Sequence, residues 1–141
     1  MRNPSPMSEP IRHVLSTGSV HWSLNGELHR TDGPAIIRPD GTEAWYLNGK
    51  PHREDGPAVI ESDGSEYWYL NDKLHREDGP AVIESYGYEA WFLNGELHRE
   101  DGPAVICPDG TEEWWVNGKR LNDHEIARQI ILANKDVDWL S

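Results

Sequence analysis

The sequence predicts an all-β repeat protein: a single elongated antiparallel meander of stacked β-hairpins, followed by one C-terminal capping α-helix. Two observations lead to this prediction. One pattern recurs every 23 residues without slippage, which is typical of a repeat architecture. Each unit also places a glycine-containing turn between two short apolar segments, as a β-hairpin does. The tryptophans that open the units are Trp22, Trp45, Trp68, Trp91 and Trp114.

The repeats divide the chain into three segments. Residues 1–12 are rich in proline and serine and are expected to be disordered. Residues 13–121 form the repeat domain, which holds four complete units and part of a fifth. Residues 122–141 form the capping helix and a tail. A chain of 141 residues is expected to be one domain.

Residues 35–47 show how one unit is expected to fold. Pro39 presets the backbone for a turn, and Gly41 takes the left-handed position of a three-residue hairpin loop. Side chains then alternate between the two faces of the sheet. One face carries Ala35, Ile37, Glu43, Trp45 and Leu47, and the other carries Ile36, Ala44 and Tyr46. The first face is identical in all four complete units, so it is the expected core, and the second is the expected open face.

The connector between hairpins is predicted to contain two bends. Asn48-Gly49 suits a turn with positive φ at both positions. Asp55-Gly56-Pro57 makes the second bend, since proline cannot donate to a strand ladder. The last repeat leads instead into Asn122, a candidate N-cap with Glu125 three residues later. We therefore expect a helix over residues 123–133, covering the last strands, because an open sheet edge invites aggregation.

Composition excludes several classes of function. Thirteen Lys and Arg stand against 25 Asp and Glu, giving a net charge of −12. Direct nucleic-acid binding and anionic membranes are disfavoured, since both need basic side chains. The single cysteine, Cys107, excludes an internal disulfide, and no apolar run approaches a membrane span. We expect a cytoplasmic monomer or weak homodimer that uses no cofactor and no metal.

Three sets of polar and aromatic residues recur with the repeat, and we interpret them as structural. A metal shared between neighbouring histidines is disfavoured, because equivalent residues lie about 10 Å apart and two zinc ligand atoms lie within about 4 Å. The glutamates should find partners, since unpaired burial is costly. Besides the tryptophans, the sets are His29, His52, His75 and His98, and Glu43, Glu66, Glu89 and Glu112.

A fourth set is the candidate contact surface for a protein partner. It is the aromatic row that follows each tryptophan: Tyr46, Tyr69, Phe92 and Trp115. Exposed aromatic stripes tend to mark interaction sites. Glu61 and Glu84 flank the row and would set the association rate.

The units resemble MORN repeats, whose period is also 23 residues. The matching segments are Asn48-Gly49-Lys50-Pro51-His52 and Asp63-Gly64-Ser65-Glu66-Tyr67. The resemblance covers about residues 14–121, and the units look still closer to the WYLNGKLHREDGPAV arrays of phages and large DNA viruses. MORN units usually carry a glycine in the aromatic strand and Gly-x-Gly after the histidine, and both are absent here. The resemblance implies stacked hairpins and protein interaction, not catalysis.

These observations favour a non-enzymatic protein-interaction module. If the source is a virus, we expect the module to inhibit a host defence protein. An acidic nucleic-acid mimic is the first alternative. The units average −13/4, about −3 charges per rise of about 10 Å, whereas duplex DNA carries roughly six over that length. A carbohydrate-binding module is the second alternative, because aromatic rows also stack on sugars.

Overall fold

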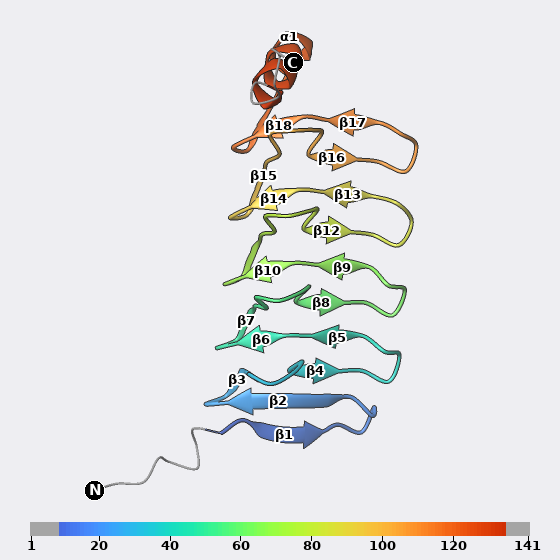
Figure 1. The fold of residues 1–141 in the computed structure, drawn as a ribbon. Helices are drawn as coiled ribbons and strands as arrows, with labels where there is room; N and C mark the ends of the chain where they lie inside the picture. The colour runs from blue at the N-terminus through green and yellow to red at the C-terminus, as the bar shows by residue number, and fades with distance from the viewer. Residues whose placement is uncertain (1–8, 135–141) are drawn as a thin grey trace, which may run out of the picture. The chain divides into compact units, whose positions relative to one another are not determined.

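The structure, a computed structural model, describes residues 9–134. Contacts divide the chain into two compact units, residues 1–73 and residues 74–141. Each unit is an antiparallel meander of short strands with small two-stranded hairpins beside it, and α1 (Asp123–Ala133) ends the second (Figure 1). The predicted fold class, an all-β antiparallel meander with one C-terminal helix, is confirmed for the described residues.

The first unit contains a meander of six strands, each antiparallel to the one before it. They are β1 (Ile11–Val14), β2 (Val20–Leu24), β4 (Ile36–Ile37), β5 (Glu43–Ala44), β8 (Val59–Ile60) and β9 (Glu66–Tyr67). Beside them, β3 (Glu27–Leu28) pairs with β2, and β6 (Tyr46–Leu47) pairs with β7 (Lys50–Pro51). β10 (Tyr69–Leu70) follows, and β11 (Lys73–Leu74) straddles the boundary of the two units.

The second unit repeats the plan with four strands in its meander. They are β12 (Val82–Ile83), β13 (Glu89–Ala90), β16 (Val105–Ile106) and β17 (Glu112–Glu113). Its hairpins pair β14 (Phe92–Leu93) with β15 (Glu96–Leu97), and β18 (Trp115–Val116) with β19 (Lys119–Arg120).

The hairpin loop has the predicted register and turn. Ile37 lies opposite Glu43, and the Arg38 backbone N–H donates to the Thr42 carbonyl at 2.9 Å. Gly41 has φ 96°, the left-handed conformation that glycine adopts without steric cost. Asp40 closes the loop, because its carboxylate accepts the Thr42 backbone N–H at 2.9 Å. That hydrogen bond holds the pKa of Asp40 below its ordinary value.

From Trp45 onward each tryptophan interrupts the strand in which the sequence placed it, whereas Trp22 lies within β2. The Trp45 N–H donates to the Ala58 carbonyl at 2.6 Å, and its carbonyl accepts from His52 N–H at 3.0 Å. Its backbone is thus bonded to two separate parts of the connector, and the ladder breaks between β5 and β6. The aromatic segment after the tryptophan therefore belongs to a hairpin of its own and not to the main sheet.

The turns of the connector also follow the sequence. Asn48 and Gly49 have φ of 52° and 78°, as the Asn-Gly pair predicts. In the third repeat Asp72 replaces the glycine and adopts φ 71°, a conformation that costs more for a residue with a Cβ.

The predicted division into a core face and an open face is wrong. Buried side chains come from both faces: Ala35, Ala58, Ala81 and Ala104 from the first, and Ile36, Ala44, Val82, Ala90 and Val105 from the second. The tryptophans are only half-buried. The side that carries them is covered by polar connectors, as described below, so small residues close to the backbone are the ones that become fully enclosed.

The two ends of the repeat region need one correction and one confirmation. β1 begins at Ile11 and pairs along its length with β2, so residues 11 and 12, expected to be disordered, are ordered by strand pairing; residues 1–8 lie outside the described residues. α1 has its predicted bounds, and Asn122 and Glu125 form the complete capping box. None of its residues is buried. The tail, residues 135–141, lies outside the described part of the chain.

Candidate functional site

In three of the repeats, one side is built around an arginine that lies on a tryptophan. The guanidinium carbon lies 3.7–4.0 Å from the ring centroid in the pairs Arg30–Trp22, Arg53–Trp45 and Arg99–Trp91. Arg53 Nε also donates to Asp55 at 3.0 Å, and its Nη1 donates to the Pro57 carbonyl at 3.1 Å. Arginine suits this position, since its planar group stacks on a ring and donates sideways at the same time.

The glycine of each Asp-Gly-Pro bend lies directly under the arginine, so a Cβ there would displace the guanidinium. A Cβ at Gly56 would lie 2.9 Å from Arg53 Cζ, and one at Gly102 would lie 2.7 Å from Arg99 Cζ. Neither glycine has a positive φ, so close approach and not backbone conformation explains the residue. The sequence showed the recurring Arg-x-Asp-Gly-Pro, but nothing in its spacing indicated that the arginine covers the tryptophan.

The histidines connect one repeat to the turn of the next. Each accepts a hydrogen bond at Nδ1, at 2.9–3.0 Å, from the backbone N–H of an asparagine 19 residues further on. The pairs are His29–Asn48, His52–Asn71, His75–Asn94 and His98–Asn117. Because Nδ1 accepts, the proton of the neutral ring is on Nε2.

That Nε2 proton points at a glutamate in three of the repeats. The Nε2 atoms of His52, His75 and His98 lie 3.2–3.4 Å from Glu54, Glu77 and Glu100. His29 has Thr31 at the corresponding position. Both ring nitrogens of these three histidines are thus engaged within the fold, and the arrangement favours a role in positioning the turns.

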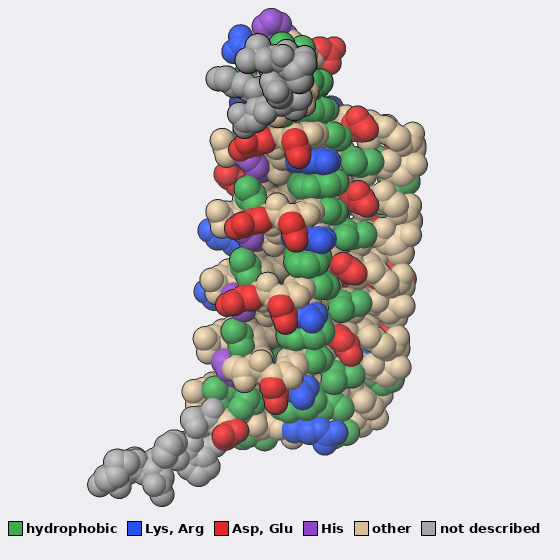
Figure 2. Space-filling model, viewed as in Figure 1, with side chains coloured by type: hydrophobic (Ala, Val, Ile, Leu, Met, Phe, Trp, Pro, Cys, Tyr) green, Lys and Arg blue, Asp and Glu red, His purple; other side chains and the backbone are tan. Residues whose placement is uncertain are grey.

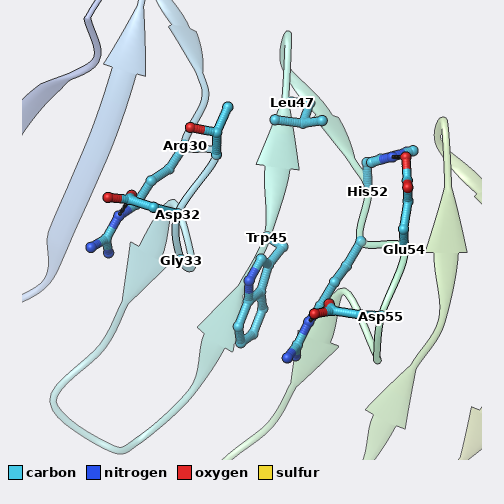
Figure 3. Close-up of a pocket in the computed structure, with 10 residues that line it drawn as sticks. Arg30, Asp32, Gly33, Trp45, Leu47, His52, Glu54 and Asp55 are labelled. Carbon is cyan, nitrogen blue, oxygen red and sulfur yellow. Dashed lines mark hydrogen bonds and ion pairs between the residues drawn. The ribbon is translucent and has the colours of Figure 1, made fainter.

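In each unit a groove lies between consecutive connectors, and the two grooves are equivalent. The groove of the first unit, about 570 Å³, is bounded by Arg30–Gly33 and His52–Asp55, with Trp45 and Leu47 as its floor (Figure 3). The groove of the second unit, about 730 Å³, uses the residues 46 positions later, from Arg76–Gly79 and His98–Asp101 with Trp91 and Leu93. Leu132 and Ala133 of α1 also line this second groove. Such dimensions suit a few inserted side chains.

The glutamates expected to be structural are not enclosed. Glu43, Glu66 and Glu89 are half-buried, and Glu112 is exposed. Glu66 accepts from Trp68 Nε1 at 3.4 Å. Among the described residues no buried side-chain polar atom is without a hydrogen bond.

The aromatic row is half-buried and sits on the two-stranded hairpins. Tyr46 and Tyr69 belong to the first unit, and Phe92 and Trp115 belong to the second. Loss of hydration, and then the charges of Asp72 and Tyr46, raise the pKa of Tyr69 above its ordinary value. Trp115 Nε1 donates to Glu113 at 2.9 Å, which fixes its ring.

The glutamates expected to flank this row lie at the hairpin loops. Glu61 is exposed and its carboxylate accepts from the Tyr67 hydroxyl at 3.3 Å. Glu84 is half-buried, and its backbone N–H donates to the Tyr88 carbonyl at 2.9 Å. These loops connect the paired strands of the meander, β8 with β9 and β12 with β13. The aromatic row lies on the separate two-stranded hairpins that follow the tryptophans.

On the side shown in Figure 2, the repeats carry acidic side chains beside a basic one, with apolar side chains next to them. The aspartates that pair with the arginines stay 78–87% exposed at Asp32, Asp55, Asp78 and Asp101. The arginines themselves are only 20–25% exposed. The groove rims therefore present carboxylates to solvent, while the paired positive charges lie beneath them.

Within residues 9–134 no three histidine, cysteine or acidic side chains gather in a way that could hold a metal ion. No helix in the same range is long and apolar enough to cross a membrane. Cys107 is a half-buried free thiol. No protein-family model and no curated protein matches this chain in sequence.

Proposed function

We propose that the chain is a non-enzymatic protein-binding module that contacts its partner through Tyr46 and Tyr69 in the first unit and Phe92 and Trp115 in the second. The observation that carries the proposal is the placement of these rings: half-buried, and fixed on hairpins. Aromatic side chains that are already ordered lose little entropy on binding and supply much of the energy of protein interfaces.

Glu61 and Glu84 would act before contact is made. The net charge of −12 and the exposed carboxylate of Glu61 would steer a basic partner toward the row. If the source is a virus, as the likeness to phage arrays implies, the partner would be a host protein of the cytoplasm, and the module would inhibit a defence function.

An acidic mimic of nucleic acid is the second candidate, and the exposed aspartates at the groove rims favour it. Each of those carboxylates has an arginine within 3.1 Å. The positive charge of the arginine weakens the negative electrostatic potential that the aspartates would present to a DNA-binding cleft. The mimic therefore ranks below the aromatic contact.

The test compares variants in binding to a partner captured with the full chain. Each variant is first shown to keep its circular dichroism spectrum and melting curve. Tyr69→Ala and Phe92→Ala should weaken binding at least about tenfold, as loss of an aromatic anchor does. Glu61→Gln and Glu84→Gln should mainly slow association. Loss of binding with the glutamate variants alone, and in a strongly salt-dependent manner, would replace this proposal with the mimic.

A further inference from the structure

Part of the C-terminal helix lines one of the repeated grooves without being buried in it. In the second unit Leu132 and Ala133 line the groove between the two connectors. Gln129, on the same face of α1, donates its side-chain amide to the Glu100 carbonyl at 3.0 Å. Residues 129, 132 and 133 stand at positions i, i+3 and i+4, which lie on one face of a helix. The contact therefore combines one amide hydrogen bond with two apolar side chains that border the groove and stay partly exposed, Leu132 at 51%.

The groove of the first unit offers the same features without a helix on it. Each of its connector residues is 46 positions before its counterpart, so Glu54 supplies the carbonyl that corresponds to that of Glu100. Trp45 and Leu47 form the same apolar floor as Trp91 and Leu93. The lining residues of this groove all belong to the first unit.

We infer that the groove between Arg30–Gly33 and His52–Asp55 binds an amphipathic helical segment of another protein. The segment would present a glutamine or asparagine at i and apolar side chains at i+3 and i+4. The Arg30 and Arg53 guanidiniums are paired to Asp32 and Asp55, and these carboxylates are 83% and 87% exposed. Basic residues beside the apolar positions of the segment would complement this rim.

A different protein is a better occupant than a second copy of this chain. If α1 of one copy moved to the free groove of another, it would leave its own groove in the second unit empty. One contact would be exchanged for an equivalent one, and the translational and rotational entropy of association would be lost. A helix from another protein fills a groove that is otherwise open, so its contact is a net gain. This surface is separate from the aromatic row and the inference does not rest on the row.

The experiment uses the full chain, labelled with nitrogen-15, and a capped peptide with the sequence of residues 122–134 as the probe. Because an isolated helix of this length is marginal in water, the expected Kd is on the order of 100 µM. At about ten times that concentration, chemical-shift changes should concentrate at Arg30–Gly33, at His52–Asp55 and at the Trp45 indole N–H. Changes at residues 76–101 alone, or none, would overturn the inference.

Two substitutions in the peptide provide matched variants that leave the protein unchanged. Leu132→Asp places a charge on the groove face and should weaken binding about tenfold. Ile131→Asp places the same charge at a residue that does not line the groove and is 69% exposed in the chain itself, against 51% for Leu132, and should change the Kd little. Equal losses from the two would mean that the peptide does not bind by this face, and would refute the inference.

Two further measurements separate the remaining alternatives. An Ile131→Lys peptide should bind about two- to threefold more tightly than Ile131→Asp at low salt, and equal affinities would refute a basic partner. Sedimentation of the full chain should show a monomer, whereas self-association abolished by Leu132→Asp in the chain would assign the groove to a second copy. Tyr69→Ala in the protein should leave peptide binding unchanged, so failure of the proposed aromatic contact and failure of this groove are distinguishable.

Discussion

The Gly56→Ala substitution would test the packing of arginine on tryptophan, which defines the repeat. The added Cβ would lie 2.9 Å from Cζ, 3.1 Å from Nε and 3.2 Å from Nη1 of Arg53. Gly56 has no positive φ, so alanine introduces no left-handed strain. The side chain that must move is the arginine, and the cost of the substitution is the loss of the contacts that Arg53 makes.

Those contacts set the expected magnitude. The stack of Arg53 on Trp45, at 3.9 Å, is worth about 0.5–1 kcal/mol at a partly exposed site. The hydrogen bond from Nη1 to the Pro57 carbonyl at 3.1 Å is worth about 1.5 kcal/mol because the donor is charged. The pair with Asp55, which is 87% exposed, adds at most ~0.5 kcal/mol. The free energy of unfolding should therefore fall by about 2–3 kcal/mol.

Urea denaturation followed by tryptophan fluorescence would measure this change, and a double-mutant cycle would assign its cause. With Arg53→Ala already present, the side chain that meets the new Cβ is absent, so Gly56→Ala should cost less than about 0.5 kcal/mol. Gly64→Ala is a contrasting variant, since its Cβ would meet nothing within 4 Å and its cost would come from the φ of 91° alone. An equal cost of Gly56→Ala with and without Arg53 would refute the reasoning.

Three more predictions address the tryptophans, the histidines and the helix cap. Trp45→Ala should lower the free energy of unfolding by about 3 kcal/mol, and Tyr46→Ala by clearly less, since only Trp45 carries an arginine; equal costs in denaturant titrations would contradict this. His52→Ala should cost about 1 kcal/mol, and His52→Asn should recover part of it because its amide oxygen can still accept the Asn71 N–H; thermal melts that show no recovery would mean that this hydrogen bond contributes little. The hydrogen bond from the N-cap backbone, and then the one from Lys119, hold the pKa of Glu125 below its ordinary value of 4.5. The ionised Glu125 carboxylate therefore stabilises the folded helix above pH 4.5, and this stabilisation is lost as the pH falls through the lower pKa of the folded state. Helical ellipticity should fall over that pH range in the wild type and not in Glu125→Gln.

The sequence predicted those features that depend on local backbone conformation. Gly41 and Asn48 stand where positive φ is required, and residues that tolerate it are few enough to be recognised in one chain. Asn122 and Glu125 likewise satisfy each other across three residues. The turn conformations and the capping box each depend on only a few neighbouring residues, so they could be predicted without knowledge of the tertiary fold.

Features that depend on side-chain packing could not be predicted. Strand alternation placed Trp45 in an apolar core, but the side chain that covers it is Arg53, eight residues later and charged. Nothing in alternation distinguishes a tryptophan under an apolar layer from one under a guanidinium. The break of the ladder at Trp45 was missed for the same reason, because it depends on hydrogen bonds to Ala58 and His52 in the connector. The groove that results was therefore also not foreseen.

The histidine bonds also bear on how such an array can change in length. Each joins atoms 19 residues apart inside a 23-residue period, so excision or duplication of one whole period restores every donor and acceptor, wherever the crossover falls. A single inserted residue between histidine and asparagine shifts one partner out of reach. Leu121 stands 23 residues after His98, where a further histidine would be. The last connector therefore has no histidine Nδ1 that would need a backbone N–H from a following repeat. New repeats should accordingly be tolerated when inserted before Trp114 and not when appended after Leu121.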